Sequence, residues 1–93
     1  MAIRSPSVPS GSPHLLVVDD DSEIRDLLSM YFSQQGIEVA AVEDGAAMDA
    51  WLARNSTDLV ILDLMLPGED GLSLADRLRS DYELPIVIIS ARG

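Results

Sequence analysis

Two short apolar runs, each ending in carboxylate residues, constrain this chain more than any other feature of its sequence. Leu15-Leu16-Val17-Val18 runs into Asp19-Asp20-Asp21, and Leu59-Val60-Ile61-Leu62 runs into Asp63. Runs that are apolar on both faces are typical of strands in a parallel sheet that is covered by helices on both sides. If the two runs are neighbouring parallel strands, at least three acidic side chains converge at one end of a sheet.

Length and composition limit what else the chain can be. Its 93 residues make at most one small domain, and no apolar stretch reaches the roughly 18 residues of a membrane span. Sixteen acidic residues against six basic ones give a net charge of -10, which argues against direct nucleic acid binding by this segment. Cysteine is absent and His14 is the single histidine, so a zinc site is excluded. No signal-peptide core begins the chain, and a cytoplasmic location is expected.

The first 13 residues differ in composition from the rest. Serine, proline and glycine dominate residues 1–13, and little apolar surface is available there to be buried. We therefore expect a flexible tail over residues 1–13. After Pro13, short apolar strands alternate with amphipathic helices, which predicts an α/β sheet with helical crossovers.

The apolar spacing predicts four strands, over residues 14–19, 37–42, 58–62 and 86–89. Helices are predicted over residues 22–35, over a weaker stripe that follows the Asp44-Gly45 turn signal and ends near Asn55, and over residues 71–80. Asp21 or Ser22 can cap the first helix, and Gly36 suits its end. The residues expected to face the core are Ile24, Leu27, Leu28, Tyr31 and Phe32 in the first helix, Met48, Trp51 and Leu52 in the second, and Leu72, Leu74, Ala75 and Leu78 in the third.

Right-handed crossovers would bring Asp20 and Asp63 to the same edge of this sheet, where ligands bind in open α/β folds. Carboxylates that lie within a few ångströms of each other are costly to ionise unless a cation neutralises them. Magnesium fits best, because it prefers oxygen ligands and the softer ligands of other metals are missing. An aspartate beside such an ion can attack a phosphoryl group and hold it as an acyl phosphate. Taken singly, residues 19–21 could be helix-capping acids and Asp63 could be a turn residue. When both groups follow apolar strands at this spacing, a metal and phosphoryl site is the stronger interpretation.

Three stretches carry a family resemblance: residues 15–21, residues 63–72 (Asp63-Leu64-Met65-Leu66-Pro67-Gly68-Glu69-Asp70-Gly71-Leu72) and residues 86–91. With them the chain resembles the receiver domain of two-component response regulators, and within that family the osmolarity regulator (OmpR) branch. The resemblance covers residues 14–93, the N-terminal four-fifths of a receiver domain. It implies a flavodoxin-like (CheY-like) doubly wound parallel sheet with strand order 2-1-3-4, the fifth β-α unit being missing.

The resemblance also implies roles for single residues. Asp63 matches the phosphoacceptor, which takes a phosphoryl group from a sensor histidine kinase. Asp19 and Asp20 match the residues that hold Mg²⁺, Asp20 directly and Asp19 through water, and Asp63 and the backbone carbonyl of Met65 would complete the protein ligands. Ser90 matches the hydroxyl residue that turns toward the phosphoryl group. Asp21 matches no ligand position, which favours a capping role.

The chain departs from the family pattern in its basic residues. The family's lysine, which pairs with the phosphoryl oxygens, would lie beyond the fourth strand, and all six basic residues of this chain are arginine. Arg92 is a poor substitute, because a guanidinium is larger and is held differently. The branch also carries a C-terminal DNA-binding domain that these residues do not contain, so DNA would be contacted only through that domain. No membrane contact is expected, and a homodimer is left open.

The missing fifth unit has a consequence for stability. Residues 86–89 would form an apolar edge strand with one face uncovered, which is an aggregation hazard. We therefore hypothesise that the 93 residues alone are marginally stable.

Three functions stay open. The first is a phosphoacceptor domain that regulates transcription and is not an enzyme, since it transfers the phosphoryl group only onto its own Asp63. The second is a truncated, signalling-impaired interaction module with the same fold. The third is a magnesium-dependent aspartyl phosphohydrolase of the haloacid dehalogenase type. Such enzymes carry a second aspartate two residues after the nucleophile, where this chain has Met65, and this counts against the third.

Overall fold

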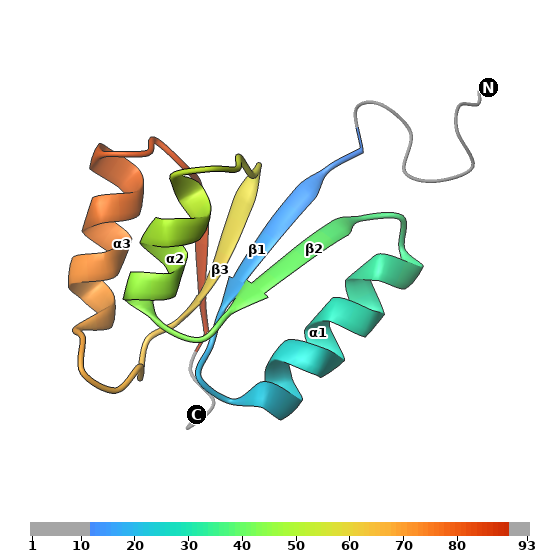
Figure 1. The fold of residues 1–93 in the computed structure, drawn as a ribbon, viewed down its shortest axis with the longest axis horizontal. Helices are drawn as coiled ribbons and strands as arrows, with labels where there is room; N and C mark the ends of the chain where they lie inside the picture. Colours follow the sequence, from blue (N-terminus) through green and yellow to red (C-terminus); the bar gives the residue numbers. More distant parts are fainter. Residues whose placement is uncertain (1–11, 90–93) are drawn as a thin grey trace.

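A parallel sheet of four strands is the centre of the computed structural model, which describes residues 12–89 (Figure 1). The strands are β1 (His14–Val18), β2 (Glu38–Val42), β3 (Leu59–Asp63) and β4 (Ile86–Ile89). The helices are α1 (Ser22–Gln34), α2 (Gly45–Leu52) and α3 (Gly71–Ser80). All seven predicted elements are therefore present in the predicted order. The expected tail lies almost wholly outside the described residues.

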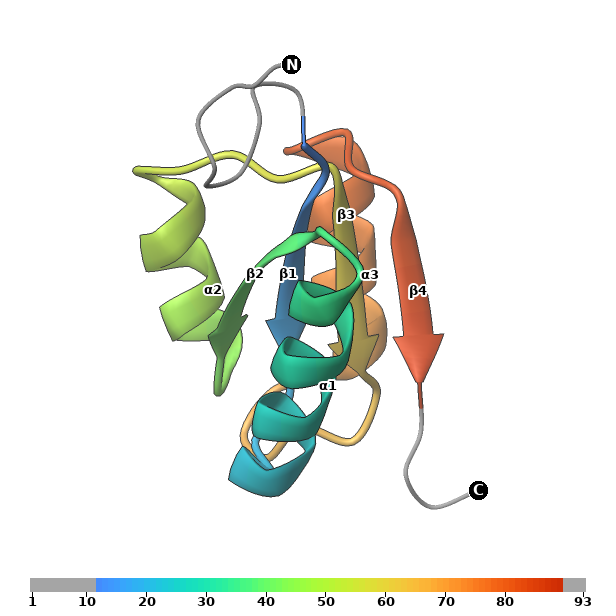
Figure 2. The same ribbon diagram turned by 90° about the vertical axis from the view of Figure 1, so that its right-hand side faces the viewer.

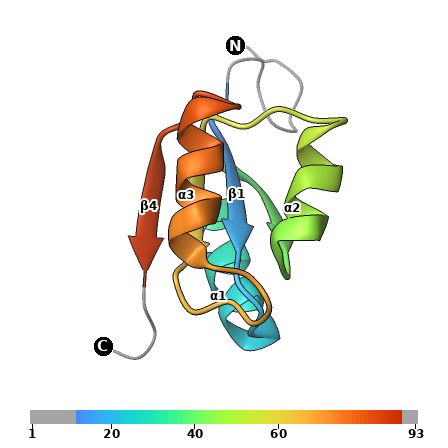
Figure 3. The same cartoon turned by 90° about the vertical axis from the view of Figure 1, so that its left-hand side faces the viewer.

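The strand order is β2-β1-β3-β4, and all neighbouring strands are parallel. Helix α1 covers one face of the sheet, as Figure 2 shows, whereas α2 and α3 cover the other face (Figure 3). The chain therefore winds from β1 to β2 on one side and returns to β3 on the other. This confirms the predicted doubly wound arrangement with order 2-1-3-4, and the strand order reverses between β1 and β3.

Alternating side chains of the strands divide the core into two clusters. Leu16 and Val18 of β1 point toward α2 and α3, whereas Leu15 and Val17 point toward α1. The cluster on the α2 and α3 side consists of Leu16, Val18, Met48, Val60, Leu62, Leu66, Leu74, Ala75 and Leu78. Strands β1 and β3 are thus fixed from both faces, and so are the residues at their carboxyl ends.

Two of the helices bury fewer of their apolar residues than expected. In α1, Leu28 and Phe32 pack against the sheet, but Leu27 and Tyr31 are 56% and 54% exposed. In α3, Leu74 is fully buried and Leu72 is 57% exposed. Residues two apart are separated by about 200° around a helix, so both leucines of α3 cannot face the same core. The inward orientation predicted for Leu27, Tyr31 and Leu72 is wrong.

An aspartate residue precedes and caps each of the three helices. The side chain of Asp21 accepts a hydrogen bond from the backbone N–H of Glu23 at 2.9 Å, which confirms the predicted cap of α1. Gly36 follows α1 with a φ of 84°, as expected for a helix stop. Asp44 accepts a hydrogen bond from the N–H of Ala47 at 2.8 Å. The chain bends at Glu43 and Asp44, at the predicted turn signal, and α2 begins at Gly45.

Strand β4 lies at one edge of the sheet formed by the described residues. Its Val87 and Ile88 are 45% and 41% exposed, in keeping with the apolar edge expected from the sequence. The marginal stability inferred from that edge stays a prediction. Between residues 12 and 89, no helix is long and apolar enough to cross a membrane.

Candidate functional site

The carboxyl ends of β1 and β3 bring three of the predicted site residues together. Asp19 and Asp20 follow β1 directly, and Asp63 is the last residue of β3. The strands are hydrogen-bonded neighbours in which Val18 pairs with Leu62. One carboxylate oxygen from each of the three aspartates lies within 4.8 Å of the other two. The cluster forms where the strand order reverses, at the edge that the sequence predicts.

Burial differs strongly among the three carboxylates. Asp19 is 1% exposed and Asp63 is 4% exposed, whereas Asp20 is open to solvent. Asp19 Oδ1 accepts a hydrogen bond from the backbone N–H of Asp21 at 2.9 Å. Its Oδ2 is buried and has no hydrogen-bond partner among residues 12–89. Buried polar atoms are nearly always satisfied, so this oxygen indicates a group that binds there.

The electrostatics of the pocket are unfavourable for three negative charges. Burial raises the pKa of Asp19, and the negative charges of Asp63 and Asp20 raise it further. The hydrogen bond from the N–H of Asp21 opposes that rise in pKa without reversing it. A cation at the carboxylates would remove the repulsion and stabilise the ionised form of Asp19.

Asp63 is held by the loop that follows it. The backbone N–H of Met65 donates a hydrogen bond to Asp63 Oδ1 at 3.0 Å, and the N–H of Leu64 donates to the Ile89 carbonyl at 3.0 Å. At the far end of the loop, Gly71 packs so closely that an added Cβ would lie 2.5 Å from the Leu64 carbonyl oxygen. The loop is therefore anchored at both ends. The Met65 side chain is 55% exposed, so it does not pack in the core.

One basic residue near the carboxylates was not predicted from the sequence. Arg25 lies in α1, and its guanidinium donates a hydrogen bond to the Asp19 backbone carbonyl at 2.8 Å. No local motif signals this contact, because it depends on how α1 packs beside the end of β1. Ser90, the remaining predicted site residue, lies outside the described residues, and so does Arg92.

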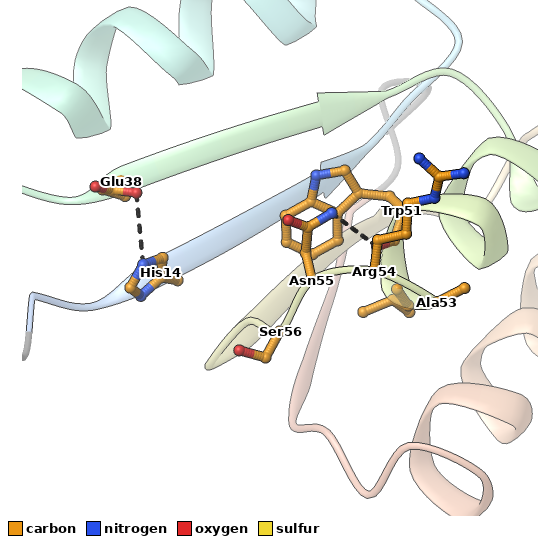
Figure 4. A pocket seen from close by; sticks show the side chains of 8 residues that line it. His14, Glu38, Trp51, Ala53, Arg54, Asn55 and Ser56 are labelled. Carbon is orange, nitrogen blue, oxygen red and sulfur yellow. Dashed lines mark hydrogen bonds and ion pairs between the residues drawn. The ribbon is translucent and has the colours of Figure 1, made fainter.

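A hollow of about 590 Å³ lies at the opposite end of the sheet (Figure 4). His14, Glu38 and Trp51 are among its lining residues, and His14 Nε2 lies 3.4 Å from Glu38 Oε1. The Asn55 side chain donates a hydrogen bond to the Trp51 carbonyl at 3.0 Å. His14 begins β1 and Asp19 follows its end, so this hollow is separate from the carboxylate pocket.

Comparison with known proteins decides the family. Residues 15–93 match the family model of the response regulator receiver domain. The chain belongs to this family. The resemblance of residues 15–21, 63–72 and 86–91 to receiver domains is thereby confirmed. Receiver domains bind Mg²⁺ at an acidic pocket and interact with histidine kinases, and the aspartate cluster described above is compatible with such a pocket.

Relatives of this receiver domain include transcription regulators. Protein PetR of Rhodobacter capsulatus is 46% identical over 81 residues, which cover 87% of this chain and 34% of PetR. Transcriptional activator protein PfeR of Pseudomonas aeruginosa is 41% identical over 87 residues, covering 94% of this chain and 28% of PfeR. The receiver domain thus spans about a third of the length of these curated relatives.

Solved receiver structures show the same fold. Response regulator protein TrrA from Thermotoga maritima, in complex with Mg(2+)-BeF, superimposes with a TM-score of 0.78 at 34% identity. The match covers 85% of this chain and 70% of that chain. The receiver domain of the Francisella response regulator 1452 gives a TM-score of 0.78 at 33% identity, covering 86% and 67%.

Proposed function

We propose that this receiver domain accepts a phosphoryl group on Asp63 from the phosphohistidine of a sensor histidine kinase. The convergence of Asp19, Asp20 and Asp63, with ligand oxygens within 4.8 Å of one another, is the observation that carries this proposal. The named functions of PfeR and of transcriptional regulatory protein GltR of Pseudomonas aeruginosa support transcription control as the output. In this proposal the DNA-binding domain lies outside the 93 residues, and the protein acts in the cytoplasm as an OmpR-branch regulator.

The residues of the pocket fit magnesium. Asp20, Asp63 and the Met65 carbonyl would hold the ion directly, and Asp19 would hold it through water. The buried Asp19 Oδ2 without a hydrogen-bond partner supports this assignment. Bound Mg²⁺ would supply positive charge that neutralises the carboxylates and orients the phosphoryl oxygens.

The chemistry itself falls to Asp63. Its Oδ1 is engaged by the Met65 N–H at 3.0 Å, so we assign the attack on phosphorus to Oδ2. The new Oδ2–P bond forms as the N–P bond to the kinase histidine breaks, and the imidazole leaves with the electron pair and takes up a proton. The product is an acyl phosphate on Asp63. The Ser90 hydroxyl is proposed to donate to a phosphoryl oxygen, and no further acceptor is required, so the domain is not an enzyme.

The test is labelling with a small phosphodonor. We expect acetyl phosphate and Mg²⁺ to add one base-labile phosphoryl group, detected by intact-protein mass spectrometry. Asp63→Asn and removal of Mg²⁺ with a chelator should each abolish the label. Asp21→Asn is the matched control, because it removes a neighbouring charge while asparagine still caps α1.

The outcomes separate the alternatives. A label that persists in Asp63→Asn would remove Asp63 from the acceptor role. A folded protein that takes no label would favour the interaction module, in which the receiver fold is kept without the chemistry. Release of many phosphates per protein molecule would favour the phosphohydrolase, for which Met65 lacks the second carboxylate.

A further inference from the structure

Arg77 joins three parts of the molecule that are distant in sequence. Its guanidinium Nη2 lies 3.0 Å from Asp49 Oδ2 in α2 and 3.2 Å from Glu69 Oε2 in the loop after β3. A second nitrogen, Nη1, also donates to Glu69 Oε2 at 3.2 Å, and Nε donates to Asp49 Oδ1 at 3.4 Å. We call Arg77, Asp49 and Glu69 the Arg77 clamp.

The clamp is partly shielded from water and closely packed. The side chains of Arg77, Asp49 and Glu69 are 29%, 41% and 34% exposed. Glu69 lies directly against Gly45, the first residue of α2, where a Cβ would collide with the Glu69 carboxylate. The Tyr82 hydroxyl donates to Asp49 Oδ1 at 3.3 Å and holds the α2 side of the clamp. Partial burial and several hydrogen bonds distinguish such a network from an exposed ion pair, which contributes little.

The clamp acts on the loop of the proposed phosphoryl site. Residues 64–70 connect the acceptor Asp63 to α3, and they include Met65. The first part of the loop is fixed by the Met65 N–H to Asp63 bond of 3.0 Å and by the buried Leu66. Its middle, at Pro67 and Gly68, is exposed. The Arg77 clamp therefore adds a side-chain anchor beyond that exposed segment, next to the close packing of Gly71 against Leu64.

We propose that Arg77 is a positioning residue for phosphoryl transfer: by holding Glu69 against α2, it fixes residues 64–70 and so the Met65 carbonyl at the Mg²⁺ site. The inference rests on the proposed function, because it assumes that this carbonyl is a magnesium ligand. Arg77 itself touches neither the acceptor nor the phosphoryl group in this proposal.

The direction in which Arg77→Met changes the Mg²⁺ affinity separates positioning by the clamp from a simple effect of the Arg77 charge. Removing the Arg77 charge makes the surroundings of the pocket more negative, which alone would attract Mg²⁺ more strongly. Loss of the clamp would release Glu69 and let the loop sample other conformations, which would weaken Mg²⁺ binding. We therefore expect Arg77→Met to bind Mg²⁺ more weakly, in opposition to the charge effect.

Two measurements test the clamp on the whole chain. Amide hydrogen exchange of residues 64–70 without metal reports the order of the loop, and titration calorimetry with MgCl₂ reports affinity. Arg79→Met is the matched control, because Arg79 lies in the same helix and, within residues 12–89, forms an ion pair only with the exposed Asp76, at 3.1 Å. We expect Arg77→Met to speed exchange in the loop and to raise the Kd for Mg²⁺ by about 3- to 10-fold, within the range by which indirect contacts modulate sites. Arg79→Met should do neither.

The outcomes are distinct. The positioning role of Arg77 would be refuted if residues 64–70 exchanged at the same rate in Arg77→Met and Arg79→Met. It would also be refuted if Arg77→Met left the Kd for Mg²⁺ unchanged or lowered it. If Arg77→Met does not fold, Glu69→Ala keeps the pair between Arg77 and Asp49 and must still speed exchange in residues 64–70. If both variants fold, the double variant should exchange no faster than Arg77→Met, because Arg77→Met already breaks the contact with Glu69. If the wild-type protein did not bind Mg²⁺, the proposed function would be refuted. Amide exchange of residues 64–70 would then be the only test of whether Arg77 orders the loop.

Discussion

At the scale of single residues, burial governs the chemistry of Asp19. Its side chain is buried, and burial together with the charges of Asp63 and Asp20 raises its pKa above the ordinary value of 3.8. The folded state therefore binds the Asp19 proton more tightly than the unfolded state, so this residue makes stability fall as pH rises between the two pKa values. We expect Asp19→Asn to stabilise the metal-free protein, by a gain that is small near pH 3.8 and grows toward neutral pH.

Urea unfolding in the presence of a chelator, at several values between about pH 4 and about pH 8, measures this gain in free energy. Asp20→Asn is the control, since it changes a neighbouring aspartate whose side chain is exposed instead of buried. A gain for Asp19→Asn that is equal at both ends of the range would contradict the assignment to ionisation.

Gly71 gives a second prediction at this scale. A Cβ at this position would lie 2.5 Å from the carbonyl oxygen of Leu64 and 2.8 Å from its Cα, both backbone atoms that cannot rotate away. We expect Gly71→Ala to lower the free energy of unfolding by about 1–3 kcal/mol, the usual cost of forcing extra volume into a packed site. Ser73→Ala, an exposed position in the same helix, should change it by less than about 0.5 kcal/mol. If Gly71→Ala and Ser73→Ala changed the free energy of unfolding equally, the backbone at residue 71 would be able to move away from Leu64 without cost.

At the scale of elements, the two leucines near the start of α3 provide a matched pair. Leu74 is fully buried against β3 and α2, whereas Leu72 is 57% exposed. We expect Leu74→Ala to cost about 2–5 kcal/mol of unfolding free energy because it leaves a cavity. Leu72→Ala should cost less than about 1 kcal/mol. Denaturant unfolding of both variants measures the difference, and similar costs would mean that Leu72 packs in the core as its spacing first indicated.

The same pair illustrates what the sequence could and could not predict about elements. Strands β1 and β3 were predictable because uninterrupted apolar runs are typical of strands covered on both faces. The inward faces of α1 and α3 were predicted only in part. Leu27 and Leu72 match a helical spacing as well as Leu28 and Leu74 do, and which of them faces the sheet depends on how the helix docks. That choice is made by packing and leaves no local signal.

At the scale of the whole molecule, the aspartates of the candidate site were more predictable from the sequence than the Arg77 clamp that holds the neighbouring loop. Asp19 and Asp63 end two strands, so the order of strands alone brings them together. Arg77, Asp49 and Glu69 belong to different elements, and no motif links positions that are 28 and 8 residues apart. Contacts of this kind follow from the docking of α2 against α3, which the sequence pattern does not specify.

Magnesium should also act on the stability of the whole fold. A ligand that binds only the folded state stabilises it by about 2.7 kcal/mol at 100 times its Kd. The net charge of -10 means that any cation will stabilise the protein somewhat by screening. Specific binding must therefore be separated from screening by comparing MgCl₂ with NaCl at equal ionic strength, using the thermal unfolding midpoint.

We expect Mg²⁺ to raise this midpoint well above the NaCl value, and Asp20→Asn to lose most of the difference, because the variant removes the exposed ligand of the pocket without disturbing the buried core. Asp26→Asn, which removes an exposed charge of α1 that does not belong to the carboxylate cluster, should retain the difference. An equal gain in both variants would mean that Mg²⁺ acts by screening the excess negative charge. A gain confined to proteins with Asp20 would place the stabilising ion at the carboxyl ends of β1 and β3, because screening cannot distinguish one exposed aspartate from another.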